Sequence, residues 1–238
     1  MAAEDSMSHA LEVEAVKARY ARRQDGSLYD MRRPDMRHTL EERRQLMRRF
    51  LSGRAWQDLS TRCALEIGCG EGNVLADLLT IGFTPERLVG IDLLPETLEQ
   101  ARRKLPAGVR LMGGDASVSR VDPMSQDLVL QFTVFSSILD CAFQEDLAET
   151  MWRYLKPSGA ILWYDAVVSN PRNPDMRGVP VHRIKQLFPK AKIDARRVTL
   201  APPLARAACR LHPSLYPLLN RIAALRSHVM AWIEKPAD

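Results

Sequence analysis

Hydrophobic and polar positions along the chain change their period several times, and each change marks the border of a predicted element. Short apolar runs alternate with longer stretches in which apolar residues recur every three or four positions, the spacing of a helix with one buried face. The apolar runs predict strands near residues 63–67, 87–92, 109–115, 126–132 and 160–165. The helical stretches between them cover residues 71–80, 95–105 and 143–155. Strands that alternate with helices predict an α/β fold, with a parallel sheet and right-handed crossovers.

The chain has a different pattern on either side of this alternating region. Helical spacing covers residues 9–23 and 38–52 before it, while a short helix at 180–188 and strands at 191–200 and 227–233 follow it. The stretch between the last two strands is rich in Leu, Pro and Arg and is predicted to be a helical lid, with a helix hairpin that only extends the core as the alternative. The expected organisation is an N-terminal helical cover (1–60), a core (61–200), the lid (201–225), and a last strand with its tail (226–238).

A glycine-rich turn, Glu66-Ile67-Gly68-Cys69-Gly70-Glu71-Gly72-Asn73, follows the first predicted strand. Such a turn lets a ligand approach bare backbone at the N-terminus of the next helix. Taken alone, it is compatible with a nucleoside triphosphate, a dinucleotide or S-adenosylmethionine. A triphosphate loop requires a lysine, and none lies near Gly72. A dinucleotide turn would place its third glycine where Asn73 stands. The acidic Glu66 before the turn disfavours a pyrophosphate and favours a cationic ligand.

Two further carboxylates follow the next two strands. Asp92 ends the second predicted strand, and Asp115 ends the third. A carboxylate at the tip of the second strand can accept both hydroxyls of a ribose. The carboxylate at the end of the third strand can pair with the exocyclic amine of adenine. Because ligands of open parallel sheets bind beyond the carboxyl ends of the strands, the turn and both acids are expected at one site. Together they favour S-adenosylmethionine.

With these motifs in place, residues 63–165 resemble the class I S-adenosylmethionine-dependent methyltransferases. The resemblance is carried by E-I-G-C-G-E-G, G-I-D, G-D-A, D-L-V-L and L-K-P-S-G, in the order found in that family. It implies a Rossmann-like, doubly wound, mostly parallel sheet of seven strands, with the last strand antiparallel. N-terminal helices and a C-terminal helical cap would cover it. Short tracts from Phe132 and from Asn170 are also similar to methyltransferases of glycan and polysaccharide biosynthesis.

The cofactor implied by the resemblance is S-adenosyl-L-methionine, and motif positions assign its contacts. The expected cofactor-binding residues are Glu66, Gly68, Cys69, Gly70, Gly72, Asn73, Asp92, Leu93, Asp115, Ala116, Gln131, Phe132 and Thr133. A hydroxyl acceptor would also benefit from a general base within hydrogen-bond reach. The two candidates are Asp165, at the end of the fifth strand, and His182, a residue type that commonly transfers protons.

Charge and composition narrow the choice of partners. The chain has 238 residues and a formal net charge of +5 at pH 7. Residues 63–182 hold 10 basic and 16 acidic side chains, whereas residues 183–238 hold 11 and three. An acidic core suits a cationic cofactor. The basic C-terminal segment predicts either a solvated face or contact with an anionic partner, such as a sugar nucleotide, a lipid-linked glycan or a membrane surface. Aromatic residues make up only 6% of the chain and no binding motif accompanies the charge, which argues against nucleic acid.

Cysteine usage and hydropathy predict a cytoplasmic protein. Cys63, Cys69, Cys141 and Cys209 have no paired spacing and are expected to be reduced thiols. No apolar run is long enough to span a bilayer, the N-terminal residues have no signal-peptide pattern, and no metal-binding spacing is present. A cytoplasmic location without a metal site is therefore the expectation.

These observations predict a methyltransferase that acts on a small or carrier-linked molecule, most simply by O-methylation of a sugar hydroxyl. The sequence Gln131-Phe132-Thr133-Val134 stands where enzymes that methylate amino groups of nucleic acids have an Asn-Pro signature. Other functions remain open at this point. They are C- or N-methylation of a secondary metabolite, a non-catalytic cofactor-binding module, and a nicotinamide-dependent oxidoreductase.

Overall fold

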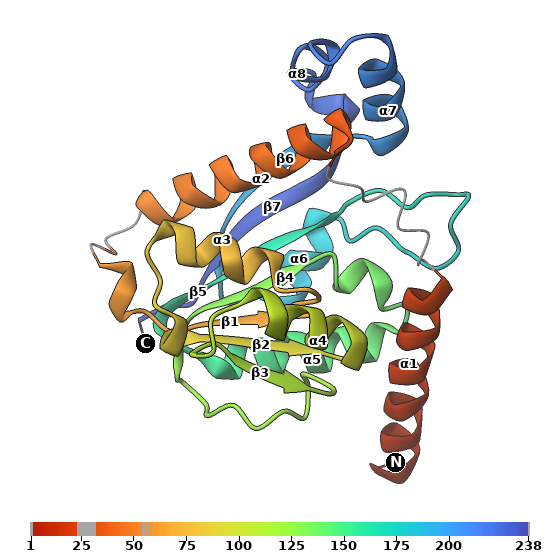
Figure 1. Cartoon of the computed structure of the whole chain (residues 1–238). Helices are drawn as coiled ribbons and strands as arrows, with labels where there is room; N and C mark the ends of the chain where they lie inside the picture. The colour runs from red at the N-terminus through yellow and green to blue at the C-terminus, as the bar shows by residue number, and fades with distance from the viewer. Residues whose placement is uncertain (1, 23–31, 54–55, 57, 238) are drawn as a thin grey trace.

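A seven-stranded sheet forms the centre of the molecule. The computed structural model describes residues 2–22, 32–53, 56 and 58–237 (Figure 1). The strands are β1 (Ala64–Ile67), β2 (Leu88–Asp92), β3 (Arg110–Gly113), β4 (Gln126–Phe132), β5 (Leu155–Ala166), β6 (Lys192–Leu200) and β7 (Arg226–Glu234). Their order across the sheet is β3-β2-β1-β4-β5-β7-β6. β1 to β5 pair in parallel, and β7 is antiparallel to both β5 and β6. The predicted mostly parallel, Rossmann-like sheet is therefore confirmed.

Helices cover both faces of this sheet. The helices are α1 (Ala2–Arg22), α2 (Pro34–Ser52), α3 (Asn73–Ile81), α4 (Pro95–Lys104), α5 (Cys141–Tyr154), α6 (Val181–Leu187), α7 (Pro202–Leu211) and α8 (Leu215–Leu219). One buried hydrophobic cluster joins the sheet to α2, α3 and α4, and a second joins it to α5, α6 and the middle of α1. Every residue of β4 is buried because this strand lies between both layers. The doubly wound arrangement follows from these two cores.

The fifth strand is longer than the sequence predicted. The pattern placed a turn at residues 156–159, because proline and glycine usually stop an element. Instead, β5 begins at Leu155, which pairs with Gln126 of β4, and the register shifts before pairing resumes at Ala160. Ser158 takes up the irregularity with a φ of 60°. The turn-like sequence is thus a bulge inside a strand.

Other boundaries moved by smaller amounts. The two N-terminal helices, predicted at 9–23 and 38–52, both begin earlier in the structure. Pro34 opens α2, where a missing backbone N–H costs nothing. The first helix after β1 begins at Asn73 rather than two residues earlier, because Gly72 in the left-handed region is its N-cap. Part of the expected N-terminal cover, residues 23–31, lies outside the described residues.

The predicted lid, residues 201–225, contains α7 and α8 and projects beyond the N-terminal end of α2 (Figure 1). It is attached to α2 through Glu42, whose carboxylate accepts hydrogen bonds from Asn220 Nδ2 at 2.8 Å and from the backbone N–H of Thr199 at 3.0 Å. Tyr216 of α8 is buried, and its ring stacks on the ring of His38 of α2 with centroids 4.8 Å apart. This segment is therefore docked in the structure, and its role as a lid stays a prediction. Across the described residues, every helix is too short or too polar to cross a membrane.

Candidate active site

A cavity of about 190 Å³ opens at the carboxyl edge of the sheet, where open α/β sheets bind ligands. Its floor comes from the ends of β1, β2 and β4, and its roof from α1, which contributes Val16 and Tyr20. Ile67, Ile91, Ile138, Phe143 and Leu147 add apolar wall. A mostly apolar pocket with a few polar groups at defined points is the usual form of a cofactor site.

The glycine turn presents bare backbone to this cavity. Gly68 has a φ of 68°, and a Cβ placed on it would lie 2.5 Å from Val134 Cγ2. Gly70 has a φ of 50°, and a Cβ there would meet open space. Both glycines line the cavity. Only glycine adopts this backbone at little cost, and the open side of Gly70 leaves room for a ligand to approach the main chain.

Asp92 ties the turn to the second strand. Its Oδ2 accepts the N–H of Gly70 at 2.7 Å, and its Oδ1 accepts the N–H of Leu94 at 2.9 Å and the hydroxyl of Thr97 at 3.1 Å. Each carboxylate oxygen can accept about two hydrogen bonds, so Oδ2 keeps a free position. Asp92 lines the cavity and can offer that position to a ribose hydroxyl.

Asp115, predicted from the sequence to contact adenine, lines the cavity. Its Oδ1 accepts the backbone N–H of Ser117 at 2.8 Å, and its Oδ2 lies 2.8 Å from the Ser117 hydroxyl and 2.5 Å from His9 Nε2. His9 belongs to α1, and its ring packs against Phe143 with centroids 4.5 Å apart. The carboxylate is therefore shared between the cavity wall and the helix that covers it.

Glu66 lies behind the glycine turn, buried on the face of β1 that α3 covers. Burial raises its pKa well above 4.5, and the N–H of Leu75 and the charge of Arg43 offset this only in part. Its Oε2 finds no hydrogen-bond partner among the described residues. The residues that fit S-adenosylmethionine are therefore the open backbone at Gly70 and the Asp92 carboxylate, with the acidic Glu66 buried behind the turn.

Comparison with known proteins places this geometry in a family. Residues 64–159 match the family model described as a methyltransferase domain. A trans-aconitate 2-methyltransferase from Afipia carboxidovorans is 30% identical over 160 residues, which cover 66% of this chain and 56% of that protein. The matched part of the chain, residues 64–159, is a methyltransferase domain of the class I, S-adenosylmethionine-dependent kind. Its cofactor is accordingly S-adenosylmethionine.

Solved structures give the same fold for this methyltransferase. An S-adenosylmethionine-dependent methyltransferase from Archaeoglobus fulgidus has a TM-score of 0.58 and 17% identity, covering 82% of this chain and 96% of that one. One from Mesorhizobium loti has a TM-score of 0.57 and 14% identity, covering 78% and 100%. At these identities the likeness concerns the fold alone.

The residues predicted to bind the cofactor divide into two groups. The first group lines the cavity and comprises Gly68, Gly70, Asp92, Leu93, Asp115, Ala116, Phe132 and Thr133. The second group lies outside the lining and comprises Glu66, Cys69, Gly72, Asn73 and Gln131. Gln131 shows why: its Oε1 accepts the N–H of Val134 at 3.0 Å, and its Nε2 donates to Tyr164 O at 3.4 Å. It shapes the chain that leaves β4, so its direct contact with the cofactor stays a prediction.

Neither of the two candidate bases lies in the cavity of the methyltransferase. Asp165 is fully buried, and its two oxygens accept the backbone N–H groups of Ser136 at 3.1 Å and Ala166 at 2.8 Å. Burial raises its pKa to about 6. His182 is exposed on α6. The structure therefore places neither residue beside the glycine turn. A catalytic role for either stays a prediction, and the positions of the two residues argue against it.

Replacing Asp165 by asparagine tests that role. An amide cannot accept from both backbone donors, so we expect a loss of about 1–3 kcal/mol in the free energy of unfolding. The turnover of folded protein should stay within about threefold of wild type, since a group outside the cavity transfers no proton to or from the acceptor. Urea unfolding and initial rates on the same samples measure both quantities. His182→Ala is the matched exposed control, and a rate loss above about 100-fold in either variant, with folding intact, would restore that residue as a base.

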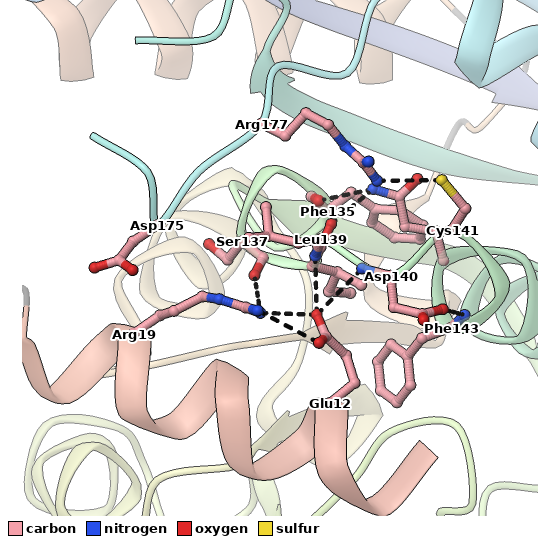
Figure 2. A network of polar contacts seen from close by, with 12 residues as sticks. Glu12, Arg19, Phe135, Ser137, Leu139, Asp140, Cys141, Phe143, Asp175 and Arg177 are labelled. Carbon is pink, nitrogen blue, oxygen red and sulfur yellow. Dashed lines mark hydrogen bonds and ion pairs between the residues drawn. The ribbon is translucent and has the colours of Figure 1, made fainter. Parts of the chain in front are cut away.

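Helix α1 was expected as a cover, but its attachments were not foreseen. Glu12 Oε1 accepts the N–H groups of Leu139 and Asp140 at 2.9 and 3.3 Å, and Arg19 donates to Glu12 at 2.7 Å and to Ser137 O at 3.1 Å (Figure 2). These contacts join α1 to the segment that leaves β4. The sequence signal was the apolar stripe of Val13, Val16 and Tyr20 at helical spacing. It indicates a buried face without saying what that face covers.

Proposed function

We propose that this methyltransferase transfers the methyl group of S-adenosylmethionine to a carboxylate oxygen of a small anionic acceptor. The observation that carries the proposal is the position of Arg43 on α2. Its guanidinium carbon lies 5.0 Å from the ring centroid of Phe132, a residue of the cavity wall, and 5.6 Å from that of Tyr164. Within the described part of the chain, Arg43 forms no hydrogen bond or ion pair. A fixed cation held on two rings beside the cavity would attract an anion.

The two ring side chains nearest to Arg43, Tyr164 and His228, bring no negative charge to it. His228 stacks on Tyr164 with ring centroids 5.1 Å apart, and burial together with Arg43 lowers the His228 pKa to about 4. Burial raises the Tyr164 pKa to about 12, and its hydroxyl lies 2.9 Å from Thr199 Oγ1. Both side chains are therefore neutral near pH 7. The buried Glu66, whose pKa is also raised, is held toward its neutral form.

A carboxylate acceptor also matches the chemistry available in the cavity. The bound cofactor supplies an activated methyl group, so the protein's contribution is to align the acceptor and exclude water. Among the described lining residues, the titratable side chains are Asp92, Asp115 and Tyr20. The two aspartates are assigned to the cofactor. A carboxylate is already a nucleophile at neutral pH and requires no base.

The curated relative supports the same class of acceptor. Its name specifies trans-aconitate, a carboxylate-bearing molecule. This chain spans only 56% of the length of that protein, so its substrate is a proposal for the present enzyme. The sugar hydroxyl predicted from the sequence is the second candidate, and it would require a base that the described cavity lining does not offer. C- or N-methylation of a secondary metabolite stays a prediction as well.

The chemical stability of the product distinguishes these acceptors. The enzyme is incubated with methyl-labelled S-adenosylmethionine and a panel of small di- and tricarboxylates, including trans-aconitate, alongside a panel of sugars. Methyl esters release labelled methanol in alkali, whereas methyl ethers, N-methyl and C-methyl groups keep the label. We expect alkali-labile product from a carboxylate. Alkali-stable product from a sugar would instead support the second candidate.

Arg43→Met tests the residue that carries the proposal. Loss of a charge-assisted contact is expected to raise KM for the carboxylate about 30-fold, with the affinity for S-adenosylhomocysteine within about threefold of wild type. Steady-state rates and calorimetry measure these two quantities. Arg48→Met, an exposed arginine on the same helix, is the matched control. A fall in cofactor affinity as large as the rise in KM would mean that Arg43 holds the cofactor, and would contradict its assignment to the acceptor.

A further inference from the structure

The segment that contains α7 and α8, residues 201–225, belongs to a stretch of unusual charge. From Ala195 to Ile233 the chain has no aspartate or glutamate, yet it contains Arg196, Arg197, Arg206, Arg210, Arg221 and Arg226. We call residues 201–225 the arginine hairpin. Its two helices project away from the sheet (Figure 1). The hairpin itself carries no acidic residue, so its own sequence has a positive net charge.

The arginine hairpin also exposes large apolar side chains. Exposed fractions are 41% for Leu204, 80% for Leu211, 57% for Leu218 and 51% for Ile222. These are half of the eight large hydrophobic side chains that are exposed in the described part of the chain. Leu204 and Leu211 are seven positions apart on α7 and so lie on one side of that helix, while Leu218 of α8 and Ile222 lie close together in the sequence. A clustered excess of this kind marks an interaction surface.

The hairpin is held in place from beneath, so its exposed side chains stay outward. Tyr216 is 2% exposed and lies with Leu200 and Ala205 in a small hydrophobic cluster of its own. Two residues of α2 hold it: Thr39 Oγ1 lies 3.2 Å from the Tyr216 hydroxyl, and the Glu42 carboxylate accepts a hydrogen bond from Asn220. This second core fixes the inner face of the hairpin and leaves Leu204, Leu211 and Leu218 exposed to solvent.

The chemistry of this surface selects an anionic lipid bilayer over other partners. Aliphatic side chains insert between lipids, and arginines attract the negative headgroups around them. Single-stranded nucleic acid is bound by stacking on aromatic rings, whereas Tyr216, the one aromatic residue of the hairpin, is buried. Two copies of the hairpin would repel each other through their arginines. We propose that the arginine hairpin docks this methyltransferase on anionic membrane surfaces.

The position of the hairpin decides which edge of the sheet faces a bound membrane. It follows the end of β6 and precedes the start of β7, which is antiparallel to its neighbours. Both of these strand ends lie at the carboxyl edge of the sheet, as the cavity does. A docked enzyme therefore turns the edge that carries its cavity toward the membrane. The docking itself requires no methyl transfer, so it can be tested whatever the acceptor is.

Co-sedimentation of the full chain with vesicles tests the proposal. The wild type should sediment with vesicles of phosphatidylglycerol and phosphatidylcholine, less so as salt is raised, and should stay in solution with phosphatidylcholine alone. Leu211→Glu combined with Leu218→Glu should lower the partition coefficient at least about tenfold. Serine at Arg206, Arg210 or Arg221 should lower it about fivefold for each arginine removed.

Matched controls separate docking from unfolding and from charge in general. Met124→Glu changes an exposed hydrophobic residue that is distant from the hairpin in the sequence. Arg102→Ser with Arg103→Ser removes two exposed arginines of α4. Both control proteins should sediment as the wild type does. All variants should bind S-adenosylhomocysteine as the wild type does, which shows that they fold. The proposal is overturned if the wild type ignores anionic vesicles, if the hairpin and control variants behave alike, or if the hairpin mediates RNA binding or dimer formation instead.

Discussion

Replacing Asp92 by alanine is expected to weaken binding of S-adenosylhomocysteine by about 100-fold or more. The variant loses the carboxylate that is predicted to accept the ribose hydroxyls. It also releases the N–H groups of Gly70 and Leu94, which fix the glycine turn. Hydrogen bonds to a charged group contribute about 1.5–3 kcal/mol each, so the loss of two accounts for this magnitude. Titration calorimetry measures it directly.

The control for Asp92 is Glu96→Ala, which removes an exposed carboxylate from the first turn of the following helix. Its cofactor affinity should equal that of the wild type, because the long-range field of an exposed acid is screened by salt. An Asp92→Ala protein that folds and binds S-adenosylhomocysteine normally would contradict the assignment. A wild type that binds NAD, and loses that binding in the variant, would instead revive the oxidoreductase alternative.

Replacing Glu66 by glutamine should change stability and cofactor binding in opposite directions. The pKa of Glu66 is raised by burial from 4.5, so its ionisation is costly in the folded protein. The stability associated with this group is complete below about pH 4.5 and is lost as the pH rises through its raised pKa. Glutamine does not titrate. The variant should therefore be increasingly more stable than the cofactor-free wild type as the pH rises above 4.5.

Cofactor binding should suffer in the same variant. A cation beside Glu66 favours its carboxylate, so binding to the wild type should release a proton, and the neutral amide loses that attraction. We expect an affinity for S-adenosylmethionine about tenfold lower at pH 8, with proton release abolished. Urea unfolding across pH, and calorimetry in two buffers of different ionisation heat, measure these effects. Glu149→Gln, on the exposed side of α5, is the control, and a destabilised Glu66→Gln protein with unchanged affinity would refute the assignment.

The alternating core and its cofactor turn were predictable because their signals are local. Strands β1, β2 and β4 are short apolar runs that end in a glycine or a polar group, and Gly68, Gly70 and Asp92 lie within one supersecondary unit. Period, turn chemistry and motif order all agree there. The same consistency places the cavity at the carboxyl edge without knowledge of any contact.

The remaining features depend on contacts between residues far apart in the chain. Glu12 meets Leu139 across 127 positions, and Glu42 meets Asn220 across 178. Nothing in the local pattern links such pairs. The position of Asp165 outside the cavity was unpredictable for a related reason. Both faces of β5 are apolar, so its sequence does not reveal which face each side chain meets, and the register with β4 and β7 turned this carboxylate into the buried layer.

The position of β7 between β5 and β6 has a consequence for biosynthesis. The ribosome releases β5 and β6 long before residues 226–234, yet neither strand has its sheet partner on that side until β7 is inserted. An emerging chain therefore carries two unpaired strand edges, one of them with the apolar sequence of β5. Such edges are templates for aggregation during synthesis. The yield of soluble protein, and its dependence on chaperones, should accordingly vary with how quickly the ribosome synthesises β7.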